Sequence, residues 1–420
     1  MNSLRTKQAR EQLLTIFAIG LEAVKGRSCV AQFLSQNRLP TQRAWVVAIG
    51  KAASGMMSGA SDFFDLPEHG SRLIEGLVIT KQGHSAVTDV SRITIIESDH
   101  PVPTQRSLDA GQQLVEFVKR VPENDTLLFL ISGGTSSLVE VLPESVSIEQ
   151  LAALNHLLLS NPWSIDEINR IRQSVSCIKN GKLLGAIKTP HCVQLTISDV
   201  ADNDLSIIGS GLLVKETKRY SDNAFELPDW VKSMQANCSI SSGPLPPGHR
   251  VEHKIIADNA QARKAIEQFA FSNDLDLIVN KTIDGEVSTA SKMIATTLKE
   301  GSPGLYVWGG ETVVNLPDNP GQGGRCQSLA LHIAEEIDQH NDTVLLAIGT
   351  DGTDGPGDVA GALVDGLTIQ RGLQFGLDSR KELLRANAGE YLEETGDLID
   401  TGPTGTNVVD LIIGLKLRFC

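Results

Sequence analysis

The chain has 420 residues, of which 41% are hydrophobic and 21% charged, as in an ordinary globular protein that is long enough for two domains. The formal net charge of −14 argues against nucleic acid or an anionic membrane as the main partner. A local cationic pocket for a small anion remains compatible with this charge, because a small ligand senses its neighbours more than the net charge.

The first predicted element is a helix around residues 13–21, LLTIFAIGL. This apolar run is shorter than the ~20 residues that span a bilayer. It is followed by Glu22 and Lys25 and not by a small-residue cleavage pattern, which favours an amphipathic helix over a signal peptide. The six cysteines are scattered without a C-x-x-C pair. We therefore expect a reduced, cytoplasmic chain with neither a zinc cage nor a disulfide framework.

Short apolar runs rich in β-branched residues predict strands. They lie at residues 45–49, 76–80, 93–98, 126–132, 193–198, 254–258, 275–280, 304–310, 343–350 and 410–417. Most are continuous, as expected of strands buried on both faces, and helical patterns such as 107–121 and 259–273 lie between many of them. This alternation predicts an α/β fold with mainly parallel sheets. The Ser-, Gly- and Pro-rich stretch 237–253 is the best domain boundary, although it could be a long loop within one domain.

Two loops after predicted strands could bind an anion, because ligands of α/β sheets gather where strand ends meet helix N-termini. In AIGKAASGM, Lys51 follows the strand and Gly50; the alternative is a surface lysine after a tight turn. In LISGGTSSLVEV, glycines, free amides and hydroxyls could cradle a phosphate, with a plain turn as the alternative. The residues concerned are Ser132, Gly133, Gly134, Thr135 and Ser136. The Walker A spacing is absent, and no G-x-G-x-x-G follows a strand.

Charged residues end two further strands. In TISDVADND, Asp199 could take a proton from a substrate hydroxyl or hold Mg²⁺ through water; an N-cap cluster is an equal alternative. The segment after residue 304 contributes Glu311 and then Arg325, which opens a helix and is suited to bidentate contact with a carboxylate or phosphate. Together the four loops indicate phosphoryl transfer, which needs cations and donors around the phosphates and a carboxylate that orients the attacking hydroxyl.

The order of several longer motifs resembles one family. The chain carries AIGKAA, DHPVPT, ISGGTSS, NRIRQSVSCIKNGKL, SDVADND, GGETVVNLPDNPGQGGRCQ, GTDGTDGPGDVAGALVD and TGPTGTNVVDL. This set resembles the class II glycerate kinases, the glycerate 2-kinase family, which phosphorylate D-glycerate with ATP, usually to 2-phosphoglycerate. The resemblance runs from about residue 10 to the C-terminus. It implies a Rossmann-like N-terminal domain with a mainly parallel sheet (residues 1–245), a smaller α/β C-terminal domain (residues 246–420) and an active site in the interdomain cleft.

The resemblance also implies roles for individual residues. Lys51 matches the family's essential lysine, Asp199 its strand-end acid and Arg325 its glycine-loop arginine, and we expect these three to be catalytic. The loop of residues 132–136 takes the place of the nucleotide phosphate loop. The residues expected to line the cleft or contact substrate are Glu311, Asp351, Asp354 and Asn407. ATP and Mg²⁺ are the expected cofactors, with Asp199 or Asp351 as the metal ligand. Asp351 and Asp354 belong to the aspartate-rich loop GTDGTDGPGD, for which the alternative is a tight turn without a ligand.

The chain departs from the family pattern at Thr135, where a third glycine is usual, and at Asn180, Asp202 and Cys326. These departures concern substrate breadth more than reaction class. Two other functions compete. One is an NAD(P)-dependent hydroxypyruvate reductase, a label that some family members carry, and the other is a non-catalytic phosphosugar-binding module. D-Glycerate is the expected small-molecule partner, a homo-oligomer is compatible with the sequence, and the choice between the 2- and 3-hydroxyl is left open.

Overall fold

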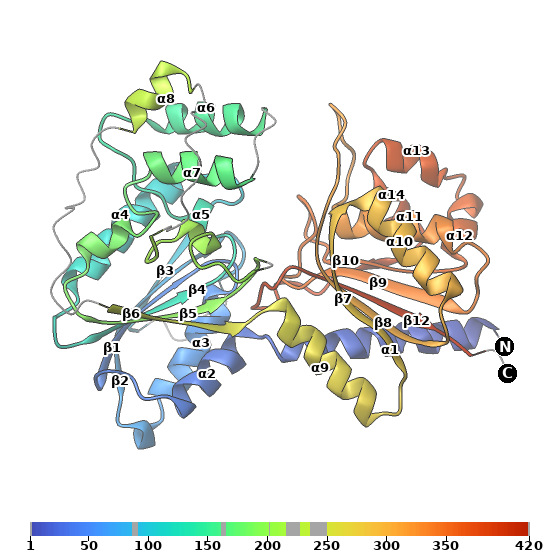
Figure 1. Ribbon diagram of the computed structural model, residues 1–420, viewed down its shortest axis with the longest axis horizontal. Helices are drawn as coiled ribbons and strands as arrows, with labels where there is room; N and C mark the ends of the chain where they lie inside the picture. Colours follow the sequence, from blue (N-terminus) through green and yellow to red (C-terminus); the bar gives the residue numbers. More distant parts are fainter. Residues whose placement is uncertain are drawn as a thin grey trace. The chain divides into compact units, whose positions relative to one another are not determined.

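The protein is described by a computed structural model that covers residues 2–85, 91–160, 165–200, 202–215, 227–235 and 250–418. The chain forms two compact units (Figure 1): an N-terminal unit of residues 26–256, and a C-terminal unit of residues 257–420 together with residues 1–25. The first helix, α1 (Asn2–Glu22), thus groups with the C-terminal unit, whereas the sequence places it in the N-terminal domain. Residues 237–249 of the expected boundary lie outside the described residues.

The N-terminal unit is built on a six-stranded sheet with the order β3-β2-β1-β4-β5-β6. Its strands are β1 (Arg43–Ile49), β2 (Arg72–Lys81), β3 (Ile93–Ser98), β4 (Thr126–Ile131), β5 (His191–Ile197) and β6 (Arg250–Ala257). The neighbouring pairs from β3 to β5 are all parallel, which confirms the predicted parallel sheet. Every residue of β4 and all but the first of β1 are buried, as expected of central strands covered on both faces.

Helices cover both faces of this sheet. Those of the N-terminal unit are α2 (Gly26–Gln36), α3 (Ala53–Phe64), α4 (Gln105–Arg120), α5 (Thr135–Leu138), α6 (Ile148–Leu159), α7 (Ile165–Val175) and α8 (Asp229–Met234). Figure 1 shows α2 and α3 on one face and α4 with α5 on the other. Helices α6, α7 and α8 share a small apolar cluster of their own, which includes Leu154, Ile168 and Val231. Asn155 of α6 and Arg172 of α7 line one cavity with His100 and Ser136, so this helical group forms a cap over the segments that follow β3 and β4.

The C-terminal unit has a second six-stranded sheet, with the order β11-β10-β9-β12-β8-β7. Its strands are β7 (Leu277–Glu286), β8 (Gly304–Val313), β9 (Thr343–Gly349), β10 (Gly361–Asp365), β11 (Leu398–Ile399) and β12 (Asp410–Lys416). Only β7 and β8 are parallel; β12 runs antiparallel to both of its neighbours, and β9, β10 and β11 form successive antiparallel pairs. The expectation of mainly parallel sheets is wrong for this unit, because β9 and β10 are joined by a loop instead of a crossover helix.

Helices also cover both faces of the second sheet (Figure 1). They are α1, α9 (Asn259–Ser272), α10 (Val287–Glu300), α11 (Arg325–Glu336), α12 (Thr368–Gln374), α13 (Ser379–Leu384) and α14 (Ala388–Glu394). Helix α1 packs on α9, β9 and β12, and its Leu13, Ile16 and Phe17 are buried. Their spacing of three, one and four residues places them on one face of a helix, which confirms the predicted first helix.

All ten predicted strands are present, and the short strands β10 and β11 were missed. Most residues of β6 and β7, the last strands at one edge of each sheet, are exposed or half-buried, in contrast to the continuous burial expected. Cys29, Cys192 and Cys326 are free and buried, but Cys177 is disulfide-bonded, so the expectation of a reduced chain is wrong at this cysteine. None of the helices among the described residues is long and apolar enough to cross a membrane.

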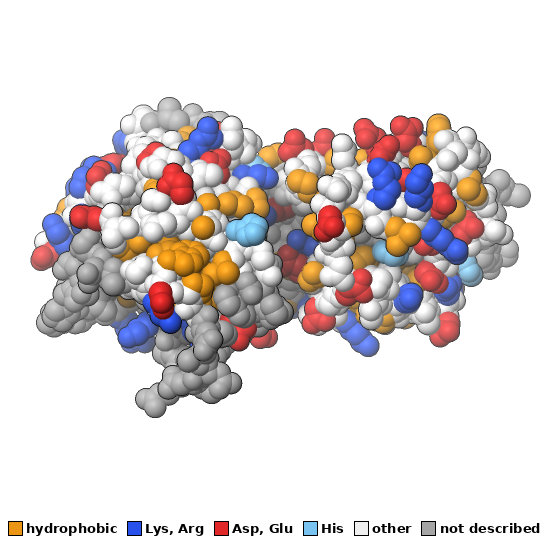
Figure 2. All heavy atoms as spheres, turned by 90° about the horizontal axis from the view of Figure 1, so that it is seen from above, with side chains coloured by type: hydrophobic (Ala, Val, Ile, Leu, Met, Phe, Trp, Pro, Cys, Tyr) orange, Lys and Arg blue, Asp and Glu red, His pale blue; other side chains and the backbone are white. Residues whose placement is uncertain are grey.

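The surface carries charges of both signs. Figure 2 shows acidic and basic side chains interspersed over one face of both units. On this face the acidic and basic side chains are therefore mixed and not gathered in one block. Local groups of residues, and not the overall field, must then set the electrostatics of a binding site.

Candidate active site

Three of the predicted site segments lie at one edge of the N-terminal sheet. Lys51 follows β1, the loop of residues 132–136 follows β4, and Asp199 follows β5. These three strands are neighbours in the sheet and run parallel, so their carboxyl ends share one edge. The fold thus brings together residues that lie up to 148 positions apart in the sequence, at the edge where α/β proteins bind ligands.

The β1 and β4 loops touch directly. Gly50 has a φ of +126°, and a Cβ atom there would lie only 2.2 Å from the Ser132 Oγ atom, so the close approach requires glycine. The Lys51 amide donates to the Gly133 carbonyl at 2.9 Å. A Cβ atom at Gly134 would lie 3.2 Å from the Lys51 Cγ atom, so the lysine side chain runs beside Gly134. Lys51 therefore extends along the loop that is expected to hold phosphate.

The members of the 132–136 loop have different environments. Ser132 and Thr135 are buried and face the backbone: the Ser132 hydroxyl accepts from the Ala52 amide at 3.1 Å. The Thr135 hydroxyl lies 2.7 Å from the Ser132 carbonyl oxygen and 3.0 Å from that of Ile49. These two side chains hold the loop in place. Gly134 and Ser136, in contrast, line a cavity and are the members placed to contact a ligand.

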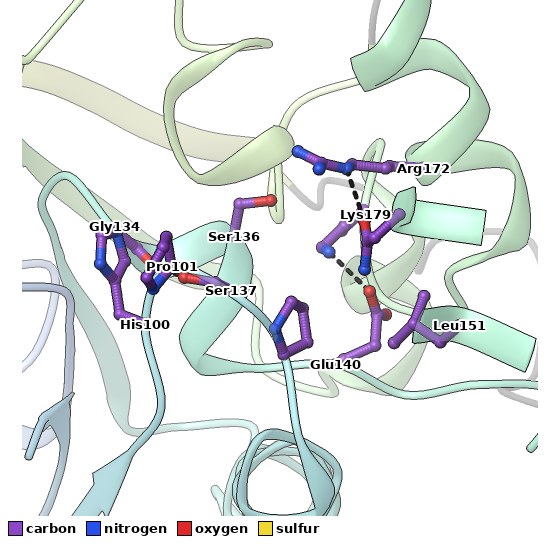
Figure 3. A pocket seen from close by; sticks show the side chains of 11 residues that line it. His100, Pro101, Gly134, Ser136, Ser137, Glu140, Leu151, Arg172 and Lys179 are labelled. Carbon is purple, nitrogen blue, oxygen red and sulfur yellow. Dashed lines mark hydrogen bonds and ion pairs between the residues drawn. The ribbon is translucent and has the colours of Figure 1, made fainter. Parts of the chain in front are cut away.

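This cavity has a volume of about 290 Å³ and lies within the N-terminal unit (Figure 3). Its polar lining comes from the segment after β4, from the loop after β3, and from the helical cap: His100, Ser136, Ser137, Glu140, Asn155, Arg172 and Lys179. Sequence reasoning did not single out His100, Glu140, Asn155, Arg172 or Lys179. The signal was present in the motif NRIRQSVSCIKNGKL, whose cations are close in sequence, but only the fold shows which of them face a cavity.

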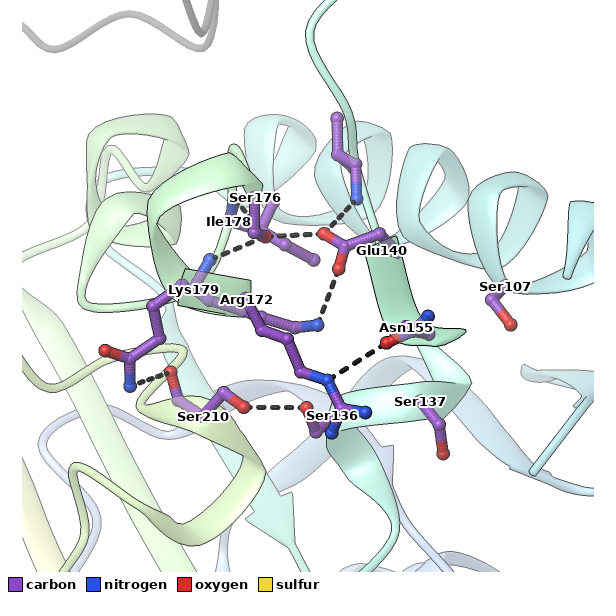
Figure 4. A network of polar contacts seen from close by, with 12 residues as sticks. Ser107, Ser136, Ser137, Glu140, Asn155, Arg172, Ser176, Ile178, Lys179 and Ser210 are labelled. Carbon is purple, nitrogen blue, oxygen red and sulfur yellow. Dashed lines mark hydrogen bonds and ion pairs between the residues drawn. The ribbon is translucent and has the colours of Figure 1, made fainter. Parts of the chain in front are cut away.

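A buried ion pair forms one wall of the cavity (Figures 3 and 4). The Lys179 Nζ atom lies 2.6 Å from the Glu140 Oε2 atom, and each side chain is only 2% exposed. The other oxygen of Glu140 accepts from the Ser176 hydroxyl at 2.5 Å and from the Val141 amide at 3.0 Å. Glu140 is thus fully engaged, which is the condition for burying an ion pair without a large desolvation cost.

Arg172, on α7, is the second cation of the cavity. Its Nε–H donates to the Asn155 Oδ1 atom on α6 at 3.0 Å (Figure 4). Burial lowers the pKa of Arg172 below its ordinary value, while the charge of Glu140 acts in the opposite direction. A guanidinium nevertheless stays protonated in proteins. The cavity therefore contains one paired and one additional positive charge, against the single negative charge of Glu140.

Arg325 is the centre of a separate cluster in the C-terminal unit. Its Nε and Nη2 atoms donate to the two carboxylate oxygens of Asp410 at 2.6 and 2.9 Å, and its Nη1 atom lies 2.8 Å from the Glu311 Oε1 atom. Burial opposes the charge on Arg325, but Asp410 and Glu311 outweigh it and raise the arginine pKa. The sequence predicted Arg325 and Glu311 and missed Asp410, which the fold places as the first residue of β12.

Asp354 caps the helix that Arg325 opens. Its carboxylate accepts from the Cys326 and Gln327 amides at 3.0 and 2.8 Å and from the Gln327 side chain at 3.0 Å. Burial raises the pKa of Asp354, and these hydrogen bonds act against the rise. Because both oxygens are used to hold the first turn of α11, this residue positions Arg325.

The two C-terminal loops that hold Asp351 and Asn407 are tied together. The Thr350 hydroxyl donates to the Val409 carbonyl at 2.6 Å and accepts from the Val408 amide at 2.9 Å. Val409 has a φ of +61°, a conformation that a β-branched residue adopts only when its surroundings enforce it. This segment leads directly into Asp410, so the strained backbone helps to aim the carboxylate that holds Arg325.

The donor set suits a metal ion that arrives with phosphates. Among the described residues, no group of three or more His, Cys, Asp or Glu side chains could hold a metal ion. Mg²⁺ in nucleotide sites usually takes one or two carboxylates together with phosphate oxygens and water, so a full protein cage is not needed. Asp199 and Asp351 are partly and largely buried carboxylates at strand-end loops, one in each unit, and either fits such a role.

Comparison with known proteins identifies two family models in the chain. Residues 12–237 match a domain of unknown function, DUF4147, and residues 304–410 match the MOFRL family. The D-glycerate 2-kinase of Thermotoga maritima is 35% identical over 94% of this chain and 95% of its own length. The glycerate 2-kinase of Pyrococcus horikoshii is 34% identical, with coverages of 89% and 87%. A crystal structure of glycerate kinase from Thermotoga maritima superposes with a TM-score of 0.82 and 32% identity, covering 98% of this chain and all of that one.

Proposed function

The chain belongs to the glycerate 2-kinase family, and from this membership we propose that it transfers the γ-phosphoryl group of ATP to D-glycerate, with 2-phosphoglycerate and ADP as products. The structural observation that supports this most directly is the convergence of Lys51, the 132–136 loop and Asp199 after three adjacent parallel strands. A cation, a glycine-containing loop and a carboxylate at one sheet edge are the parts that phosphoryl transfer requires.

The proposed reaction is a displacement at phosphorus. The 2-hydroxyl oxygen of glycerate attacks the γ-phosphorus, the bond from that phosphorus to the bridging oxygen breaks, and the hydroxyl proton passes to the carboxylate of Asp199. The ammonium of Lys51 stabilises the negative charge on the transferred group, and the Gly134 amide and Ser136 hydroxyl orient the phosphates. Ser132, Gly133 and Thr135 act indirectly, by fixing the loop against Lys51 and the end of β1.

Mg²⁺ bound with the nucleotide would neutralise part of the phosphate charge, and Asp199 or Asp351 would hold it. The remaining roles fall to groups of the chain itself. Asp199 follows β5, the neighbour of the strand β4 that leads into the 132–136 loop. In this position its carboxylate would lie near the phosphates, whether it accepts the hydroxyl proton or holds the metal.

We assign the Arg325 cluster to the glycerate carboxylate. Asp410, which is buried, holds one edge of the guanidinium, whereas the partner at Nη1 is Glu311, whose side chain is 53% exposed. A half-exposed carboxylate in a surface ion pair is easily exchanged for the carboxylate of a substrate. Glu311 would then occupy, in the absence of glycerate, the position of the substrate's charge. Asp354, Asp351 and Asn407 support this cluster through α11 and the paired loops.

The experiment that tests the proposed function is a pair of coupled assays followed by product analysis. Purified protein with ATP, Mg²⁺ and D-glycerate should release ADP, and ¹H–³¹P NMR should place the phosphate on C2. Hydroxypyruvate with NADH or NADPH, assayed in parallel, should give no oxidation of the coenzyme. Coenzyme oxidation without ADP release would favour a reductase, and inactivity in both assays would favour a binding module. A phosphate on C3 would correct the position of transfer.

A further inference from the structure

The cavity of the N-terminal unit has an arginine without an acidic partner. Among the described residues, no ion pair joins Arg172 to a carboxylate, and its recorded partner is the neutral side chain of Asn155. Glu140, which lines the same cavity, is occupied by Lys179, by the Ser176 hydroxyl and by a backbone amide. A half-buried guanidinium in this situation carries charge that an anion from solution can neutralise.

Asn155 supplies an independent indication of a ligand. The residue is 6% exposed and lines the cavity, and its Oδ1 atom accepts from Arg172. Its Nδ2 atom is buried and has no hydrogen-bond partner in the part of the chain that the structure describes. Buried amide donors are nearly always satisfied in native proteins, so this donor calls for an acceptor. An oxygen atom of a bound molecule in the cavity would provide it.

We propose that Arg172 and Asn155 form a binding site for an oxyanion of the kinase substrates: a phosphate group of the nucleotide or, in place of the role assigned above to Arg325, the carboxylate of glycerate. This inference rests on the proposed function for the identity of the ligand. Both candidates present two or more oxygens that can accept from the outer edge of the guanidinium and from the asparagine amide together. The Asn155–Arg172 hydrogen bond fixes the two donors relative to each other, because it uses the Nε edge of the arginine and leaves the Nη atoms available.

The position of the cavity connects this site to the phosphate loop. Gly134 lines the cavity and also lies beside Lys51 and His100, whose atoms would be 3.2 Å from a Cβ atom at this glycine. Ser136, the next ligand-facing residue, shares a hydrogen bond of 2.6 Å with Ser210 (Figure 4). An anion held by Arg172 is therefore adjacent to the loop assigned to phosphate binding. It would act as an anchor for one end of a substrate that Lys51 contacts elsewhere.

The test compares the binding of three probes to four proteins by calorimetry. Pyrophosphate, ADP and D-glycerate are titrated separately into the wild type, Arg172→Gln, Asn155→Asp and a control, Arg120→Gln. Arg120 forms an exposed ion pair with Glu75, so its replacement removes one positive charge from the same unit without touching the cavity. If the anion is a phosphate, Arg172→Gln weakens pyrophosphate and ADP at least tenfold and leaves glycerate unchanged. If the anion is the carboxylate of glycerate, Arg172→Gln weakens glycerate at least tenfold and leaves pyrophosphate and ADP unchanged.

Asn155→Asp tests the site in a second way, because the aspartate side chain has nearly the same shape as asparagine and keeps the oxygen that contacts Arg172. The new carboxylate would neutralise the guanidinium within the protein, so the same probe should again bind at least tenfold more weakly, while the thermal unfolding temperature stays equal or rises. A purely structural Arg172–Asn155 contact predicts a stable variant with unchanged binding, and unchanged binding of all three probes in Arg172→Gln and Asn155→Asp would overturn the proposal. Arg120→Gln should bind every probe as the wild type does.

The outcome is separable from that of the proposed function. Turnover of glycerate is measured on the wild type alone, whereas the anion site is measured by binding without catalysis. A wild type that binds pyrophosphate through Arg172 but does not phosphorylate glycerate would refute the kinase assignment and support the anion site. A wild type that phosphorylates glycerate, with unaltered probe binding in both variants, would support the kinase assignment and refute the anion site.

Discussion

Lys51 is the residue on which the proposed chemistry depends most in the N-terminal unit. Its amide donates a hydrogen bond to the Gly133 carbonyl and its side chain passes Gly134, so the loop of residues 132–136 sets its direction. Lys51→Ala would remove the charge-assisted contact that we propose with the transferred group, and it should lower kcat by roughly 10²-fold or more. Steady-state assays of ADP release measure this loss. The matched control is Lys119→Ala, at the exposed end of α4, which should keep wild-type turnover; equal activity in the two variants would contradict the assignment.

Arg325 is the corresponding residue of the C-terminal unit, and the structure changes what its substitution tests. Arg325→Lys keeps the charge but loses the bidentate contact with Asp410, which is buried. We expect most of the activity to be lost, together with stability on the order of 1–3 kcal/mol, because a buried carboxylate becomes incompletely paired. Activity assays and thermal unfolding report the two effects.

The double variant Arg325→Lys/Asp410→Asn separates these roles. Removing the charge of the Asp410 carboxylate should restore much of the lost stability, since the buried group is then neutral. Activity should stay low, because a lysine cannot replace the bidentate guanidinium of Arg325. Recovery of kcat along with stability would show that the arginine acts only through the fold. Normal kcat and KM in the single variant would remove Arg325 from the reaction altogether.

At the scale of elements, one closed network of two arginines and two aspartates attaches α1 to the C-terminal sheet. Arg10 of α1 contacts Asp365 and Asp397 at 2.7 and 3.0 Å, and Arg371 of α12 contacts the same two acids at 3.0 and 2.7 Å. Both aspartates are buried. Burial alone would raise the pKa of Asp365, but the hydrogen bond and charge of Arg371, with the charge of Arg10, lower it below its ordinary value.

This lowered pKa predicts how stability depends on pH. The unfolded state takes up a proton near pH ~3.9, whereas the folded state resists protonation until a lower pH. The stabilisation from Asp365 is therefore present above the unfolded pKa and lost as the pH falls through the folded pKa. The melting temperature should fall more steeply below about pH 4 in the wild type than in Asp365→Asn, which should be less stable at pH 7.

The control for this prediction is Asp276→Asn, at an exposed ion pair with Arg418 in the same unit. Its pH profile should follow that of the wild type, because exposed pairs contribute little. Parallel profiles for wild type and Asp365→Asn would mean that the network does not titrate as a stabilising unit.

For the whole molecule, the division of the chain predicts an unusual effect of the N-terminal helix. Ile16 is fully buried in α1, which packs on β9 and β12. Ile16→Ala should cost about 2–5 kcal/mol and loosen the C-terminal unit, although residue 16 is far from it in sequence. Hydrogen exchange should increase in peptides from β9 and β12 and stay unchanged in β1 and β4.

Leu34→Ala gives the reciprocal control, because Leu34 is buried in α2 of the N-terminal unit. It removes an apolar side chain of similar size and should increase exchange in the N-terminal sheet only. If Ile16→Ala loosened β1 and β4 in place of β9 and β12, α1 would belong to the N-terminal unit in solution.

The sequence by itself determined ten of the twelve strands, the α/β class of the fold and the loops to which we assign the chemistry. Apolar runs such as 126–132 and glycine-rich turns such as the one at Gly50 reflect interactions within a few residues, so they can be read locally. The same holds for the motif order that placed the chain in its family. The convergence of Lys51 and Asp199 was also predictable, because the carboxyl ends of parallel strands share an edge.

Only the tertiary structure decided which side chains meet. Arg325 pairs with Asp410, 85 residues later, because β12 enters the sheet between β9 and β8. Arg172 and Asn155 face one cavity because α6 and α7 pack together, and α1 joins the second unit through contacts with strands more than 300 residues away. The partner of a charged side chain depends on topology, since many carboxylates compete for each cation and local pattern does not distinguish among them.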